Sequence, residues 1–265
     1  MSVCPTCGKE YSDLKVHLNQ SYPEHLPEEW QTCHECGKWY SKLGAHWSMS
    51  DCEYPNMSRY QHEIITGILM GDGWIDKDKK HPRLSVSVTE KEYLGYVHRE
   101  LDILSNGVKL KETAESNSSR KSRPKENYND LYRLSTICHP SLEQYENWYN
   151  SGKKVWPDNI KMTPIILKHW YCCDGHYKDT NGDNYITISM SNEVDNTDKI
   201  GCYFSNKNLP SPAWQFGESK LDGQTWPRCI ARWTVDQSEK LFNYMGEPVP
   251  GYEYKWPDRL NTDVV

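Results

Sequence analysis

Apolar and polar positions follow the same succession twice between residues 58 and 265. Segments with an apolar residue every three or four positions alternate with segments in which every second residue is apolar. The helix-like segments are 59–72, 91–104, a segment from Pro140, 164–174, 195–204 and 238–244. The strand-like segments are 83–89, 108–112, 131–137, 185–191, 213–218 and 230–235. This succession predicts an α+β fold of two pseudo-symmetric halves, each in the order α-β-β-α-β-β-α, whose curved antiparallel sheets form a saddle.

Two of the helix-like runs, 65–73 and 167–175, end in Asp-Gly. In the first run Gly67 and Gly71 are four residues apart, so they lie on one helix face and let a second backbone approach closely. If the two helices pack side by side, Asp72 and Asp174 meet at their tips. Carboxylates in contact repel each other unless a cation lies between them, so the pair predicts a divalent metal site.

Residues 1–57 contain a repeat of a different kind. Two Cys-x-x-Cys pairs are each followed, after nine further residues, by a histidine. The expected ligands are Cys4, Cys7, His17 and His25 in the first copy, and Cys33, Cys36, His46 and Cys52 in the second. His34 is an alternative to His25 as the fourth ligand. Such sets suit tetrahedral Zn²⁺, and a segment this short has too little core to fold without the metal.

The chain therefore divides into three parts. Residues 1–57 hold two tandem zinc fingers (about 1–29 and 30–57), and they resemble fingers of the Cys2His2 kind with a shorter Cys-to-His gap. The two halves of the larger unit are 58–157 and 158–265. The finger segment carries four Lys and no Arg against eight Asp and Glu. Fingers that read the major groove are usually basic, so both DNA contact and a docking role stay open.

Composition narrows the class of partner. The net charge of -6 argues against a polycation that coats nucleic acid, so any DNA-binding surface is a local patch. The 11 Trp and 18 Tyr can stack on bases, or they can be half-buried aromatic residues of an ordinary core. We find no apolar run that predicts a signal peptide or a membrane span, and the ten Cys do not form a disulfide pattern. We therefore expect an intracellular protein, cytoplasmic or nucleoid-associated, in a reducing compartment.

The two Asp-Gly runs resemble the paired motifs of monomeric LAGLIDADG homing endonucleases. The resemblance covers about residues 58–258, and the order of elements after each motif agrees with it. The departures lie in the second motif, where Lys168 and His169 stand at positions that are commonly small, and Cys172 and Cys173 replace residues that are often acidic or small.

The resemblance implies a phosphodiesterase centre. It implies metal ligation by Asp72 and Asp174, with Gly71 and Cys173 contributing beside them, and Mg²⁺ or Mn²⁺ as the cofactor. It implies two central lysines, Lys154 (with Lys153 as the second choice) and Lys255. It also implies solvent-orienting side chains at the strand ends, Glu90 and Asn192.

The same resemblance implies that the outer sheet faces lie in the major groove of DNA. The candidate contacts are Arg83, Ser85, Ser87, Arg133, Thr187, Ser189, Gln215, Arg228 and Arg232. A basic loop adds Arg120, Lys121 and Arg123. A solvated sheet face and an ordinary flexible loop are the competing interpretations.

The implied function is sequence-specific cleavage of double-stranded DNA by a monomer at a long, nearly asymmetric site, as in intron homing. The alternative on the same fold is an RNA maturase that assists splicing, or a DNA-binding regulator that does not cleave. We do not expect a protein-splicing element, because the first residue is Met and the last three are Asp-Val-Val.

Overall fold

A computed structural model describes residues 2–4, 6–20, 30–77, 80–118, 129–150, 153–180, 183–191, 193–221 and 224–260. Several residues singled out from the sequence lie outside these ranges: His25, Arg120, Lys121, Arg123 and Asn192. Each finger copy consists of a short hairpin and a helix. The elements are β1 (Ser2–Val3), β2 (Glu10–Tyr11) and α1 (Leu14–Gln20), then β3 (Gln31–Thr32), β4 (Trp39–Tyr40) and α2 (Leu43–Met49).

The first half follows from residue 59. Its elements are α3 (Arg59–Met70), β5 (Gly73–Asp76), β6 (Arg83–Val88), α4 (Lys91–Leu101), η2 (Asp102–Leu104), β7 (Ser105–Glu112), α5 (Ala114–Ser118), β8 (Leu131–Thr136) and the 3-10 helix η4 (Pro140–Trp148). A small hairpin of β9 (Tyr149–Asn150) and β10 (Lys153–Lys154) leads to the second half. The four main strands form an antiparallel sheet in the order β5-β6-β8-β7.

The second half repeats this arrangement. Its elements are α6 (Pro164–Asp174), β11 (Gly175–Thr180), β12 (Asp183–Ser189), η5 (Val194–Asn196), α7 (Thr197–Ser205), β13 (Ala213–Leu221), β14 (Gln224–Arg232), α8 (Val235–Met245), η6 (Glu253–Lys255) and η7 (Asp258–Leu260). Its sheet has the corresponding order β11-β12-β14-β13. The expected α+β fold of two similar halves with antiparallel sheets is therefore confirmed. None of the described helices is both long and apolar enough to cross a bilayer.

Three details of the expected elements are wrong. Residues 115–118, expected in a loop, belong to α5. The last half of the expected strand 230–235 is not a strand, because the Thr234 hydroxyl accepts from Gln237 N and starts α8 with a capping box. The preceding hairpin is longer than expected, since β14 already begins at Gln224.

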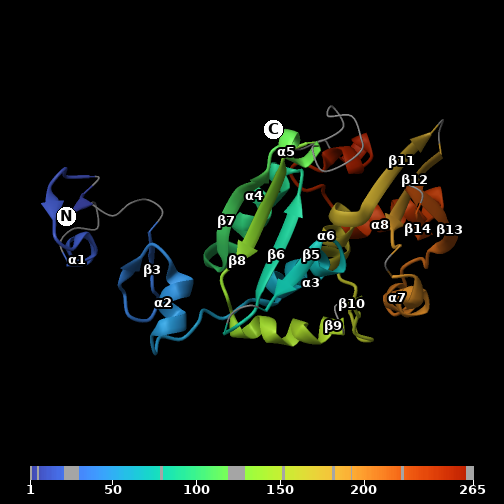
Figure 1. The fold of residues 1–265 in the computed structure, drawn as a ribbon. Helices are drawn as coiled ribbons and strands as arrows, with labels where there is room; N and C mark the ends of the chain where they lie inside the picture. The colour runs from blue at the N-terminus through green and yellow to red at the C-terminus, as the bar shows by residue number, and fades with distance from the viewer. Residues whose placement is uncertain are drawn as a thin grey trace.

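Helices α3 and α6 join the two halves, and they lie side by side at the centre of the molecule (Figure 1). A Cβ placed on Gly67 would lie 2.5 Å from the carbonyl oxygen of Ile166 and 2.7 Å from the His169 Cβ. One turn later, a Cβ on Gly71 would collide with the Cys173 Cβ. Gly67 thus allows α3 to touch the backbone of α6, and Gly71 leaves room for the Cys173 side chain; a larger residue at either position would prevent the contact.

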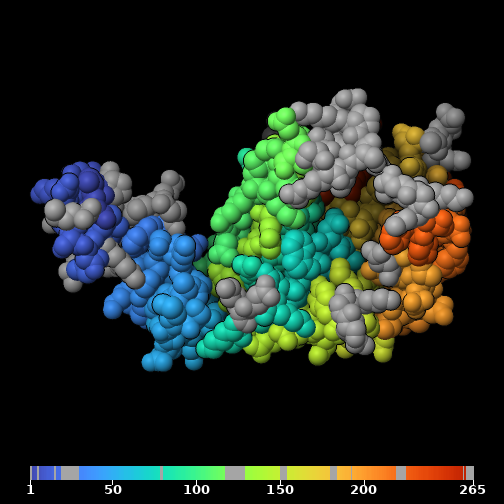
Figure 2. All heavy atoms as spheres, viewed as in Figure 1, coloured from blue at the N-terminus to red at the C-terminus, as the bar shows by residue number. Residues whose placement is uncertain are grey.

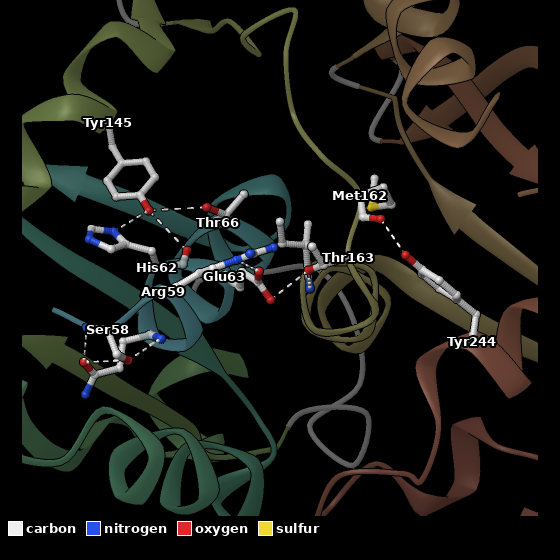
Figure 3. A network of polar contacts seen from close by, with 11 residues as sticks. Ser58, Arg59, His62, Glu63, Thr66, Tyr145, Met162, Thr163 and Tyr244 are labelled. Carbon is white, nitrogen blue, oxygen red and sulfur yellow. Dashed lines mark hydrogen bonds and ion pairs between the residues drawn. The ribbon is translucent and has the colours of Figure 1, made fainter. Parts of the chain in front are cut away.

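Polar contacts hold the opposite ends of the same two helices (Figure 3). The Thr163 hydroxyl, which also starts α6, donates to Glu63 of α3 at 3.0 Å. Glu63 accepts in addition from Arg59, one turn earlier, at 2.9 Å. On the second half, the Tyr244 hydroxyl donates to the carbonyl of Met162 at 2.7 Å. These bonds fix the starts of the helices, and the close glycine contacts fix their tips.

We predict that Gly67→Ala destabilises the protein by about 1–3 kcal/mol, because the new methyl group must displace the backbone of α6. Gly201→Ala in α7 is the control: nothing lies within 4 Å of its added Cβ. The control should be neutral or stabilising by up to about 1 kcal/mol, since alanine favours helix. Urea unfolding followed by tryptophan fluorescence measures both, and equal stability of the two variants would refute the close-packing argument.

Candidate active centre and metal sites

The two motif acids lie at the meeting point of the helix tips. Gly71 ends α3, so Asp72 follows its last turn, and Asp174 is the last residue of α6. A Cβ on Gly71 would lie 3.3 Å from Asp174 Oδ2, which shows how near the second carboxylate is to the first motif. The carboxyl ends of both helices carry partial negative charge, and this adds to the repulsion between the acids. The arrangement therefore favours a cation.

Two lysines hold the helix ends. Lys154 Nζ donates to the carbonyl oxygens of Gly71 (2.8 Å) and Gly73 (3.1 Å). Lys255 Nζ donates to the carbonyl oxygen of Cys172 at 2.6 Å. One lysine thus serves each motif, and each comes from the segment after its own half. The side chain of Lys153, the second choice, lies outside the described residues.

The charges at this centre are mutually dependent. Burial, the neighbouring Asp72 and Glu193 raise the pKa of Asp174 to about 7. The pKa of Asp72 is also raised by the protein packed around it, although part of the residue is exposed, and Lys255 and Lys154 oppose the rise. Burial lowers the pKa of both lysines, and the acids partly offset this. A divalent cation bound between the carboxylates would favour their ionised forms.

The strand-end candidates are placed differently from the paired acids. Glu90 is the residue before α4 and interacts with the Tyr254 hydroxyl. Asn192 lies outside the described residues. Its neighbour Glu193, which the sequence reasoning missed, interacts electrostatically with both Asp174 and Lys154. The Glu193 backbone N–H donates to the carbonyl oxygen of Met190, so the chain turns after β12. The alternation of inward and outward side chains along the strand therefore does not extend to residue 193.

An open cavity of about 370 Å³ lies at the first motif. Asp72, Cys173, Lys255 and Ser87 contribute to its wall. Asp72 is exposed on this side. Cys172 and His169, by contrast, are buried packing residues: His169 Nδ1 is 2.9 Å from the Tyr93 hydroxyl, and burial lowers its pKa to about 3.

The described sheet candidates share the face opposite the core. Cross-strand partners lie on the same face, and the register pairs Ser85 with Ser135, Ser87 with Arg133, and Thr187 with Arg232. Ser189 and Gln215 both pair with Ile230, and Arg228 pairs with Gly217.

These faces already contain internal contacts. Arg83 pairs with Asp76, and Arg133 donates to the buried Ser85 at 2.9 Å while lying over the Trp74 ring. In the second half, Arg232 lies 4.1 Å from the centre of the Tyr185 ring. These contacts hold the three arginine side chains in place on the sheet faces. Ser85 and Thr187 are buried.

The finger repeat gathers its sulfur and nitrogen atoms into two groups. Cys33, Cys36, His46 and Cys52 form one, and Cys4, Cys7 and His17 form the other, with all ligand atoms of each group within 4.8 Å of one another. The expected fourth ligand of the first group, His25, lies outside the described residues.

Both groups fit a tetrahedral ion. The Cys36 Sγ to His46 Nε2 distance is 3.6 Å, and the Cys7 Sγ to His17 Nε2 distance is 3.8 Å. Tetrahedral Zn²⁺ bonds of ordinary length give a sulfur–nitrogen separation of about 3.6 Å. A tyrosine stacks on each histidine ring, Tyr11 in the first copy and Tyr40 in the second. The donor sets therefore fit zinc. The repeat also includes the tyrosines that stack on the two histidine rings.

Comparisons with known proteins assign the chain to a family. The model of the LAGLIDADG DNA endonuclease family matches residues 62–211, more than half of the chain, and the chain belongs to this family. It is 28% identical over 123 residues to cytochrome b mRNA maturase bI2 of Debaryomyces hansenii, a match that covers 43% of this chain and 44% of that protein. The chain thus spans less than half the length of this relative.

A solved structure of the homing endonuclease I-WcaI bound to its DNA recognition sequence has a similar fold. The TM-score is 0.59 and the sequence identity is 18%, with 76% of this chain and 88% of that chain covered. At this identity the likeness concerns the fold alone.

We predict that Asp174→Asn changes the pH dependence of stability when no divalent cation is added. Folded Asp174 keeps its proton up to about pH 7, whereas the unfolded carboxyl loses it near 3.8. The wild type therefore loses stability as pH rises from about 4 to 7, by up to about 4 kcal/mol, and the variant lacks this loss.

Urea unfolding at pH 5 and pH 8 measures the difference, with the exposed Asp179→Asn as the control that should follow the wild type. If Asp174→Asn shows the same pH dependence of stability as the wild type, folding does not raise the pKa of the Asp174 carboxyl.

Proposed function

We propose that this protein is a site-specific endonuclease that cuts both strands of a long DNA target in a reaction dependent on Mg²⁺ or Mn²⁺. The observation that carries the proposal is the pair of carboxylates at the touching helix tips, each beside a lysine-bound helix end. Such a pair is costly to keep for packing alone, and hard divalent cations prefer oxygen ligands.

The residues divide the chemistry as follows. Asp72 and Asp174 would hold the cations, with main-chain oxygens of Gly71 and Cys173 nearby. Bound Mg²⁺ would make a water nucleophilic and stabilise charge on the leaving 3′ oxygen. Lys154 and Lys255 are fixed by carbonyl oxygens next to these acids, so their charge opposes the negative charge that develops on the phosphate.

Glu193, the neighbour of the predicted Asn192, would take part in this centre beside Lys154. Glu90 interacts with Tyr254 and would act, if at all, at the margin of the cavity. The outer sheet faces, with Arg83, Arg133 and Arg232, would contact the bases and phosphates of the duplex.

A second candidate function is assistance to RNA splicing. The observation that favours it is the similarity to the cytochrome b mRNA maturase. A binder that does not cleave has no need of two adjacent acids at a helix junction, and for this reason we place cleavage first.

We predict that Asp72→Asn lowers DNA cleavage at least about 100-fold and leaves DNA binding largely intact, because the variant loses a metal ligand and keeps the sheet faces. Purified full-length protein is incubated with a randomised duplex library and Mg²⁺, and the cut ends are sequenced. Asp179→Asn serves as the control and should cleave like the wild type. Absence of cuts by folded wild-type protein, together with tight binding of structured RNA, would favour the splicing function instead.

We also propose that the finger segment binds two Zn²⁺ ions per chain, one at each Cys and His group. Cys36→Ala should lower the zinc content, measured by mass spectrometry of the purified protein, by about one ion per chain. The exposed Cys202→Ala changes an unrelated thiol and should retain both ions. Equal zinc content in the two variants would exclude Cys36 as a ligand.

A further inference from the structure

The second finger packs directly against the first half. His139 Nε2 donates to the carbonyl oxygen of Pro55 at 2.8 Å, and the Tyr54 ring meets the His81 and His139 rings edge-on. A Cβ on Gly44 of α2 would lie 2.9 Å from Ile137, so the finger helix touches the chain that follows β8. Figure 2 shows residues 30–57 abutting the first half, with the first finger projecting beyond them. The second finger therefore has a defined place relative to the sheet.

A groove of about 1330 Å³ runs between this finger and the end of the first sheet. Its described lining contains five Lys and Arg side chains and no Asp or Glu. The finger contributes Lys42, the turn before β6 contributes Lys80, and β7 contributes Lys109, all three exposed. The chain as a whole has more acids than bases, so a groove whose described charged side chains are all basic stands out.

The acids of the second finger lie away from the groove. Glu35, Asp51 and Glu53 are absent from its described lining, and the Glu35 carboxylate accepts from the backbone N–H of Glu53. The net negative charge of the finger segment therefore does not describe the side that faces the sheet. Serines at 41, 48 and 135 add hydroxyl groups to this surface.

The groove is continuous with the outer face of the sheet, because Arg83 and Arg133 belong to both. Its volume exceeds the usual size of a small-molecule site. Basic side chains with interspersed hydroxyls suit phosphodiesters, which are positioned mainly by Lys, Arg and Ser contacts.

We propose that this groove holds the sugar-phosphate backbone of duplex DNA that flanks the cleavage site on the side of the first half. The second finger then lengthens the contact on one side only. This inference rests on the proposed function, since it takes the duplex on the sheet as given.

The test begins with a duplex that full-length protein enriches from a randomised library. Hydroxyl-radical footprinting on this duplex should show protection that extends further from the cleavage point on one side than on the other. Lys42→Gln combined with Lys80→Gln should shorten the longer side. Lys38→Gln combined with Lys207→Gln is the matched control, because it removes two exposed lysines that are not in the described lining.

Salt dependence provides the second measurement. The groove variant should reduce the slope of log binding constant against log salt concentration by about 1.8, and the control variant should not. Trimming the longer flank from the duplex should lower the wild-type slope equally and abolish the difference between the wild type and the groove variant.

Each outcome decides between the two proposals. A symmetric footprint with unchanged slopes would overturn the groove inference and leave the endonuclease proposal standing. If the protein enriches no duplex and binds structured RNA instead, both proposals fail together. Zinc content equal to that of the wild type verifies that the variants retain their fingers.

Discussion

The contact between α3 and α6 is the constraint on which the rest of the structure depends. Gly67 lies against the backbone of α6 and Gly71 against the Cys173 side chain, and this closeness places Asp72 near Asp174. The two sheets can face a common ligand only because their halves meet along this line. A helix pair separated by ordinary side chains would lie 8–10 Å apart. Asp72 and Asp174 would then lie further apart, and their carboxylates would interact less strongly.

Closeness has an electrostatic cost, and the chain offsets it locally. The acids stand at helix ends whose carbonyl oxygens already repel them, and burial raises the pKa of Asp174. Lys154 and Lys255 neutralise the carbonyls of Gly71, Gly73 and Cys172. The lysines therefore stabilise the helix ends and reduce the repulsion between the acids. A bound cation would complete the neutralisation and leave the lysine charges available to a phosphate.

Sequence reasoning identified what depends on local pattern. The order of elements, the Asp-Gly tips and the repeat of cysteines and histidines follow from spacing, and the fold agrees. It did not identify Glu193, because the chain turns after β12 and the alternation along the strand does not extend to this residue. It also extended a strand to Val235, although the capping box of Thr234 and Gln237 signals the start of a helix there. The docking of the second finger on Ile137 and His139 depends on contacts distant in sequence, and no local pattern encodes them.

The docked finger also explains why a net charge is a poor guide to a small domain. The finger segment has a net charge of -4, yet Lys42 of the second finger lines the groove and none of the described acids of that finger does. A duplex held in the proposed groove would interact mainly with this side of the finger, because exposed charges separated by more than about 8 Å are largely screened at physiological salt. The second finger docks on the first half. A nearly two-fold scaffold thereby acquires an asymmetric surface.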